Sequence, residues 1–224
     1  MNMGIARNIE RINALLPQGV TLVAVSKTKP DEDILEAYGA GQRIFGENKV
    51  QEMCAKYERL PKDIEWHMIG HLQSNKIKFI VPFVRMIHSV DSPDLLRKIN
   101  AAAEKAGRRI DCLLEVHIAR EETKFGFSGE EALEMALGDE VKNMEWVRVK
   151  GLMGMASNTP DMEWVREEFK TLKDYSDRLK SRAPEMDVLS MGMSGDYPVA
   201  VECGSTMVRV GSGIFGIRNY QAEG

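Results

Sequence analysis

The sequence has few cysteines, no long apolar run and no excess of positive charge. Its three cysteines, Cys54, Cys112 and Cys203, are odd in number and widely spaced, which argues against a disulfide framework or a zinc site. The longest apolar runs have the length of a strand, whereas a membrane-spanning helix needs about 20 such residues. The formal net charge of −4 gives no sign of binding to nucleic acid or to an anionic membrane.

The chain also lacks sequence features that would divide it or export it. Its first residues contain no apolar segment of the signal-peptide type, and no Pro-, Gly- or Ser-rich linker interrupts it. We therefore expect residues 1–224 to form a single domain of a cytoplasmic protein whose thiols stay reduced. A lean eight-stranded α/β barrel, which needs roughly 200–250 residues, fits this length.

Eight short runs rich in Val, Ile, Leu and Met alternate with charged, amphipathic stretches. Several runs are almost continuously apolar, as buried parallel strands are. The predicted strands are residues 21–26, 43–45, 65–69, 85–90, 111–118, 148–153, 188–191 and 207–210.

The intervening stretches carry helix signals. Residues 92–105 are predicted as a helix with Ser92 as its N-cap and Pro93 at the first position, and residues 5–16 place an apolar residue on one face at nearly every turn. After Thr159-Pro160, apolar residues again recur at helical spacing, with Thr159 as the expected N-cap.

This alternation predicts an α/β fold, a single (β/α)₈ TIM barrel with an extra N-terminal helix. The alternative is an open, doubly wound sheet. No Gly-x-Gly-x-x-Gly follows the first strand, which disfavours the dinucleotide-binding form of that sheet.

Functional groups of a barrel lie where its strands end, and the first predicted strand ends at Lys27. A lysine at that position is partly desolvated, which lowers the pKa of its ammonium and makes the amine nucleophilic toward a carbonyl. Alternatively, Lys27 only extends its ammonium out of the barrel into solvent.

The loops after the seventh and eighth strands are rich in glycine and serine. Ser194 and Gly195 follow the seventh strand, and Gly211, Ser212 and Gly213 follow the eighth. Phosphate sites in barrels are frequently formed by these two loops, because exposed amides and hydroxyls there donate to an anion. The alternative is a pair of ordinary tight turns. Since the first and eighth strands are neighbours in a closed barrel, the combination suits a phosphorylated aldehyde.

Arg209 lies two residues before Gly211, where the period of a strand directs it into the barrel. A buried arginine needs an acceptor, which a heteroaromatic nitrogen can supply. A structural ion pair with Glu202 or Glu115 is the alternative. The four histidines lie in or just after strands, but their spacing matches no metal-binding motif, so we expect no metal.

Taken together, the motifs resemble those of the pyridoxal-phosphate homeostasis proteins, over nearly the whole chain. They are AVSKTKP at 24–30, FGENKVQE at 45–52, WHMIGHLQSNK at 66–76, HSVDS at 88–92, KFGF at 124–127, GLMGMA at 151–156, LSMGMSGDY at 189–197 and GSTMVRVGSGIFG at 204–216. That family is a single barrel similar to the N-terminal domain of alanine racemase.

The resemblance implies that pyridoxal 5′-phosphate is held as a Schiff base on Lys27. It further implies that Arg209 faces the pyridine nitrogen and that Asn48 and His71 lie beside the cofactor. The phosphate would be held by Ser194, Gly211 and Ser212. Three positions depart from the family pattern: Lys49 replaces a common aromatic residue, His117 a common asparagine, and Ser212 a usual threonine whose hydroxyl it keeps.

Three functions are compatible with these residues. The first is a monomeric cofactor carrier in vitamin B6 homeostasis, with no catalytic residues of its own and with pyridoxal-phosphate-dependent apo-enzymes as possible partners. The second is an amino-acid racemase, and the third is a Schiff-base aldolase. Racemisation needs an acid–base group on both faces of the substrate. In the similar racemases a second domain supplies one of them, and the chain ends at Gly224 without such a domain unless Tyr197 or a histidine replaces it. The sequence therefore favours the carrier.

Overall fold

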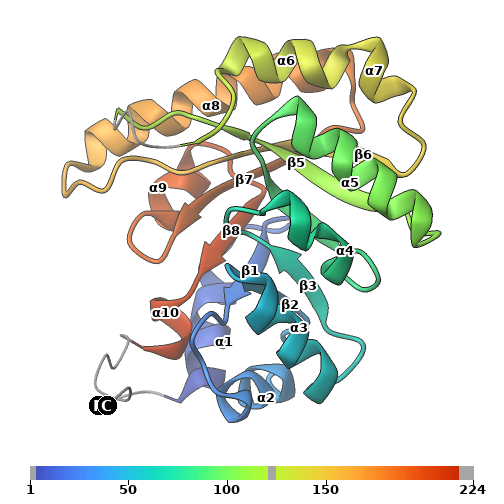
Figure 1. The fold of residues 1–224 in the computed structure, drawn as a ribbon. Helices are drawn as coiled ribbons and strands as arrows, with labels where there is room; N and C mark the ends of the chain where they lie inside the picture. The colour runs from blue at the N-terminus through green and yellow to red at the C-terminus, as the bar shows by residue number, and fades with distance from the viewer. Residues whose placement is uncertain (1–3, 121–124, 217–224) are drawn as a thin grey trace.

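The computed structural model describes residues 4–120 and 125–216, so the remainder of the predicted single domain, including Lys124 of the KFGF motif, lies outside the described residues. Eight parallel strands form a closed barrel in the order β1 to β8 (Figure 1). The strands are Thr21–Val25 (β1), Ile44–Glu47 (β2), Glu65–Met68 (β3), Met86–Val90 (β4), Ile110–Val116 (β5), Val147–Gly154 (β6), Val188–Met193 (β7) and Met207–Val210 (β8).

Pairing between the first and last strands closes the barrel. Thr21 lies beside Met207 and Ala24 beside Val210, in parallel register. The predicted (β/α)₈ barrel is therefore confirmed, and the open-sheet alternative is excluded, since an open sheet leaves two edge strands unpaired.

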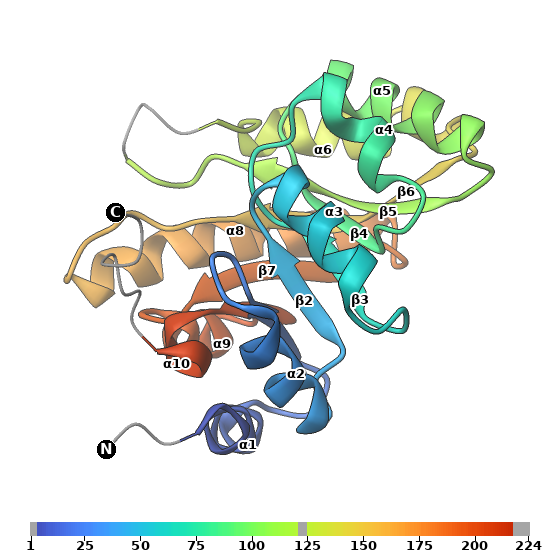
Figure 2. The ribbon, with the colours of Figure 1, turned by 60° about the horizontal axis from the view of Figure 1, so that its bottom comes forward.

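The helices lie outside the barrel (Figures 1 and 2). In chain order they are Ile5–Leu15 (α1), Asp31–Gly39 (α2), Val50–Arg59 (α3), the 3₁₀ turn Ser74–Lys76 (η1), Ile77–Ile80 (α4), Pro93–Lys105 (α5), Gly129–Leu137 (α6), Asp139–Lys142 (α7), Met162–Arg182 (α8), Tyr197–Glu202 (α9) and Ser212–Phe215 (α10).

The predicted N-terminal helix is present as α1, which packs between α2 and α10 (Figure 1). Its buried face carries Ile9 and Ile12. The Asn8 amide donates to the Ile214 carbonyl over 2.8 Å, so the start of the chain is bonded to the element that follows β8.

Two helix starts test the capping predictions. Ser92 caps α5 as expected, because its hydroxyl accepts from the Leu95 amide, with Pro93 at the first position. The predicted long helix is present as α8, but the predicted N-cap, Thr159, was wrong. The N-cap is Asp161, which accepts from the amides of Glu163 and Trp164, each at 3.1 Å. Thr159 instead accepts from the Asp161 amide in the turn before the helix.

The apolar core has two parts. Most buried residues lie between the barrel and the surrounding helices, and a smaller cluster that includes Val23, Leu113 and Met153 fills the lumen. A filled lumen is typical of eight-stranded barrels and leaves the strand ends as the place for a site. In the described part of the chain, no helix combines the length and apolar character needed to cross a membrane.

Candidate functional site

A cavity of about 480 Å³ opens at the carboxyl ends of the strands. Six of the seven predicted site residues line it: Lys27, Asn48, Ser194, Arg209, Gly211 and Ser212. They come from β1, β2, β7 and β8 or from the residues just after these strands. Closure of the barrel thus gathers residues from both ends of the chain around one space.

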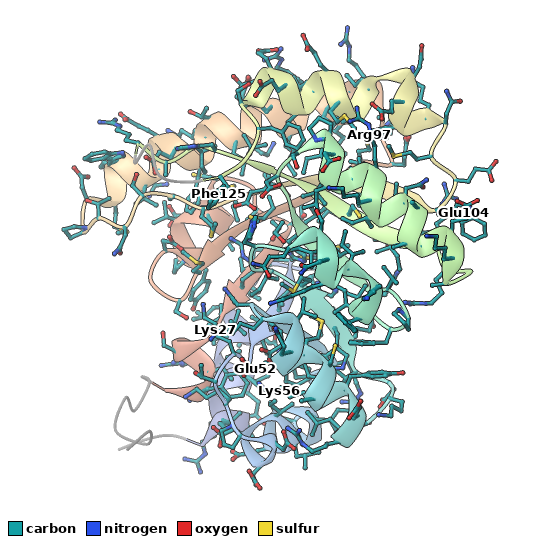
Figure 3. All side chains as sticks on the ribbon, in the orientation of Figure 1. Lys27, Glu52, Lys56, Arg97, Glu104 and Phe125 are labelled. Carbon is teal, nitrogen blue, oxygen red and sulfur yellow. The ribbon has the colours of Figure 1, made fainter. Side chains whose placement is uncertain are left out.

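The backbone on both sides of Lys27 is held by one buried lysine and its carboxylate partner. Lys56, on α3, donates to the Ser26 carbonyl over 2.8 Å and to Glu52 over 2.7 Å, and Glu52 accepts from the Thr28 amide over 2.6 Å. Both peptide groups that flank Lys27 are therefore hydrogen bonded. Lys27, Glu52 and Lys56 lie near one another in Figure 3.

Thr28 has a φ of 64°, the one positive φ at a non-glycine among the described residues. A threonine in this left-handed region costs of order 1–3 kcal/mol, which the surrounding contacts must offset. The bond from its amide to Glu52 contributes to that compensation.

Lys56 is 3% exposed, and its third hydrogen bond goes to the fully buried Glu47 over 2.8 Å. Glu47 also accepts from the Ser26 hydroxyl, while its second oxygen has no partner among the described residues. Burial raises the pKa of Glu47, and the Lys56 charge opposes that rise.

We expect Lys56→Met to lower the free energy of unfolding by about 3–5 kcal/mol, because it leaves buried Glu47 without its cation. The measurement is urea unfolding at pH 7. Lys98→Met is the matched control: Lys98 pairs with Asp94 at the surface, so its loss should cost at most about 0.5 kcal/mol. Equal effects of the two substitutions would contradict the prediction.

The two glycine-rich loops meet at Ser194. Its Oγ accepts from the Gly211 amide over 3.0 Å and from the Gly213 amide over 3.3 Å. A Cβ at Gly211 would lie 3.3 Å from the Val25 carbonyl oxygen, so a larger residue would crowd the end of β1. The loops therefore collect amide and hydroxyl groups at one point, as an oxyanion site requires.

Arg209 points into the barrel and is 3% exposed. Its guanidinium donates to the Ser190 hydroxyl over 2.6 Å and to the Gly154 carbonyl over 3.1 Å. Burial lowers its pKa to about 10, so it remains a cation at neutral pH. The alternative partner Glu202 instead binds Arg166 over 2.7 Å.

Glu115, the other alternative partner, acts on Arg209 through its charge. Burial raises the pKa of Glu115 to about 7; the negative charge of Asp91 adds to the rise and Arg209 opposes it. The hydrogen bonds of the Arg209 guanidinium thus go to neutral oxygens rather than to a carboxylate.

Asn48, just after β2, also lines the cavity. Its buried Oδ1 has no hydrogen-bond partner among the described residues, which suits a site that a polar ligand completes. Gly70 makes the close approach possible, since a Cβ there would lie 2.5 Å from the Asn48 carbonyl oxygen.

His71 is not among the residues that line the cavity. It is half-exposed at the rim, where its Nδ1 lies 3.1 Å from Asp91 and its ring stacks on Phe125 at 5.1 Å. Its predicted place beside the cofactor stays a prediction. Two residues that depart from the family pattern lie as follows. Lys49 is exposed at the start of α3, and a ring nitrogen of His117 lies 2.7 Å from the Ala119 carbonyl oxygen.

Sequence reasoning missed Lys56 and the pairing of Ser190 with Arg209. Lys56 was detectable, because it falls three residues after Met53 on the buried face of α3. Ser190 offered no comparable signal, since its partners lie on other strands. Among the described residues, no group of three or more His, Cys, Asp or Glu side chains is arranged to hold a metal ion.

Comparison with known proteins identifies the family. Residues 4–219 match the family model of the alanine racemase N-terminal domain. The pyridoxal phosphate homeostasis protein of Vibrio alginolyticus is 38% identical, with 96% of this chain and 98% of that protein aligned. Its counterpart in Aquifex aeolicus is 41% identical over 89% of this chain and 87% of that protein.

The chain belongs to the pyridoxal phosphate homeostasis protein family. Among solved structures, PipY of Synechococcus elongatus, determined with pyridoxal phosphate bound, is 37% identical with a TM-score of 0.85, covering 95% of this chain and 100% of that one. Alanine racemase of Clostridium difficile has a TM-score of 0.80 at 16% identity and covers 97% of this chain but 58% of that chain. The latter likeness concerns the fold alone.

Proposed function

We propose that this protein binds pyridoxal 5′-phosphate as a Schiff base on Lys27 and acts as a cofactor carrier in intracellular pyridoxal-phosphate homeostasis. The observation that carries the proposal is one cavity that contains a lysine, a cationic arginine and a cluster of anion-binding groups. Membership of the family and the bound pyridoxal phosphate in PipY support the same ligand.

The residues fit this cofactor at both ends. The amides of Gly211 and Gly213 meet the Ser194 hydroxyl, and Ser212 lies on the same wall, so these groups suit the phosphate. Arg209 suits the ring nitrogen, because a guanidinium only donates hydrogen bonds. When bound, the cofactor supplies an aldehyde that a lysine amine can hold covalently.

The lining of the cavity favours carriage over catalysis. Apart from Lys27, Lys29 and the cationic Arg209, the described lining residues carry no acidic or basic side chain. Lys29 donates to the carbonyls of Phe215 and Gly216. A racemase, the second candidate, needs proton transfer on both faces of its substrate, and Tyr197 does not line the cavity.

The test is an absorption spectrum of the purified protein loaded with pyridoxal 5′-phosphate, before and after borohydride. We expect a band near the edge of the visible range that disappears on reduction, with a pyridoxyl adduct on Lys27 by peptide mass spectrometry. Lys27→Ala should lose the adduct, because the amine that forms the covalent bond is gone.

Lys29→Ala is the matched control for this experiment, since Lys29 lines the same cavity. It should retain the adduct on Lys27. An adduct found on Lys29 or another lysine, with Lys27 unmodified in the wild-type protein, would contradict the assignment.

The proposal extends to the setting in which the carrier works. We propose a cytoplasmic monomer that passes the cofactor to pyridoxal-phosphate-dependent apo-enzymes. Mixing the loaded protein with such an apo-enzyme should restore that enzyme's activity at a rate that depends on the concentration of the carrier.

A further inference from the structure

Four buried polar side chains form a hydrogen-bonded row across the barrel lumen, here called the lumen row: His67, His88, Ser190 and Arg209. His67 Nδ1 lies 2.9 Å from His88 Nε2, and His88 Nδ1 lies 3.1 Å from Ser190 Oγ. Arg209 then donates to Ser190 over 2.6 Å. Since β4 and β7 are not neighbours in the barrel, the contact between His88 and Ser190 spans the lumen.

The arginine at one end sets the direction of every bond in the row. A guanidinium has no acceptor, so Ser190 Oγ must accept from Arg209. The Ser190 hydroxyl proton can then go only to His88 Nδ1, which makes that nitrogen an acceptor and places the His88 hydrogen on Nε2. His88 Nε2 therefore donates to His67 Nδ1, and the His67 hydrogen also lies on Nε2.

The reverse direction of these hydrogen bonds is disfavoured, because it leaves the Ser190 hydroxyl proton without an acceptor. If His88 donated from Nδ1, Ser190 would accept twice, and its hydroxyl proton would have no acceptor at a fully buried position. An unsatisfied buried donor costs about 1–3 kcal/mol, whereas the direction set by Arg209 gives the Ser190 hydroxyl proton an acceptor in His88 Nδ1.

Arg209 is the only charged side chain in the lumen row. Burial lowers the pKa of His67 to about 3 and lowers that of His88 well below its ordinary value, and the nearby Arg209 charge adds to the effect on His88. Both imidazoles are thus neutral at physiological pH. Glu115 and Asp196 act on Arg209 electrostatically, but neither is a member of the row.

We propose that His88 is a positioning residue, which acts through Ser190 to hold the Arg209 guanidinium as a donor toward the cavity. Arg209, at the cavity end of the row, would then donate a hydrogen bond to the lone pair of a heteroaromatic nitrogen. No member of the row would transfer a proton to that nitrogen. This inference rests on the proposed function for the identity of the ligand, but its geometry is a property of the protein alone. It gives a physical reason why a cofactor bound here would be stored rather than activated.

The first test uses the full chain without added ligand. Long-range ¹⁵N–¹H NMR of the histidine rings should show His67 and His88 neutral between pH 5.5 and 8, each protonated on Nε2. The solvent-exposed His71 provides an internal comparison. A hydrogen on Nδ1 of His88, or a charged His88 in this range, would overturn the direction of the row.

The second test asks whether His88 positions Arg209. In His88→Leu, the hydrogen exchange of the Arg209 guanidinium with solvent should accelerate at least about tenfold, the equivalent of one lost hydrogen bond of about 1.4 kcal/mol. His88→Gln can still accept from Ser190 and should restore slow exchange. Ser190→Ala removes only the hydroxyl and should behave like His88→Leu, which keeps the test decisive if the leucine variant does not fold.

Unchanged guanidinium exchange in the folded variants would overturn the proposal. Failure of the proposed function is a separate outcome, because the wild-type protein would then not bind pyridoxal 5′-phosphate. The guanidinium exchange rates would still test the role of His88, since they are measured without ligand. With ligand bound, the ¹⁵N shift of its ring nitrogen should move toward the protonated value in His88→Leu but not in His88→Gln.

Discussion

Pyridoxal 5′-phosphate is expected to bind this protein at least about 100-fold more tightly than pyridoxal. Charge-assisted hydrogen bonds contribute roughly 1.5–3 kcal/mol each, so even two of them give about 3 kcal/mol, and 1.4 kcal/mol is a factor of ten. The amides of Gly211 and Gly213 already lie within hydrogen-bond distance of the Ser194 hydroxyl. The measurement is a calorimetric or fluorescence titration of both ligands at one salt concentration.

A variant separates the phosphate loops from the rest of the cavity. Ser194→Ala removes a hydroxyl donor and the oxygen that orders the amides of Gly211 and Gly213, so it should weaken binding of the phosphorylated ligand about tenfold or more. Its effect on pyridoxal should be small. Ser181→Ala is the control: Ser181 is an exposed residue of α8, so its substitution should change neither affinity. Equal affinities for the two ligands in the wild-type protein would rule out this phosphate site.

The protein loaded with pyridoxal 5′-phosphate is expected not to racemise alanine. A protonated pyridine ring withdraws electrons strongly, but Arg209 is a cation and cannot accept that proton, so the ring nitrogen facing it stays neutral. The other amine in the described lining of the cavity, Lys29, donates to the carbonyls of Phe215 and Gly216. Weak activation and the engagement of Lys29 by these carbonyls act in the same direction.

The measurement is deuterium incorporation at Cα of L- and D-alanine in heavy water, at high protein concentration. Slow exchange with retention of configuration would agree with Lys27 acting on one face. Exchange with inversion at rates of roughly 1–10³ s⁻¹, the ordinary range of enzymes, would establish a racemase and refute the carrier.

Much of the fold could be predicted from the sequence, because each strand and helix carries a local pattern. All eight predicted strands are present, and the start of α5 follows from Ser92 and Pro93. The long helix α8 shows the limit of local patterns. Thr159 was predicted as its N-cap, but Asp161, two residues later, is the cap, because its carboxylate accepts from two amides at once.

The position of the candidate site was also determined by the sequence. Once eight strands alternate with helices, Lys27 and the loops at Ser194 and Gly211 must lie at the carboxyl ends of neighbouring strands. The family motifs added which ligand these residues suit. Six of the seven residues assigned in this way share one cavity.

Only the tertiary structure decided the contacts that cross the lumen or connect distant elements. His88 and Ser190 are 102 residues apart and meet because the barrel is closed, and no periodicity in the chain encodes that distance. Likewise, Glu52 and Lys56 have the spacing of an ordinary surface pair, yet in the folded chain Lys56 is buried and donates to the Ser26 carbonyl beside Lys27. Local sequence specifies which elements form, whereas the burial and partners of a polar side chain depend on how those elements close around it.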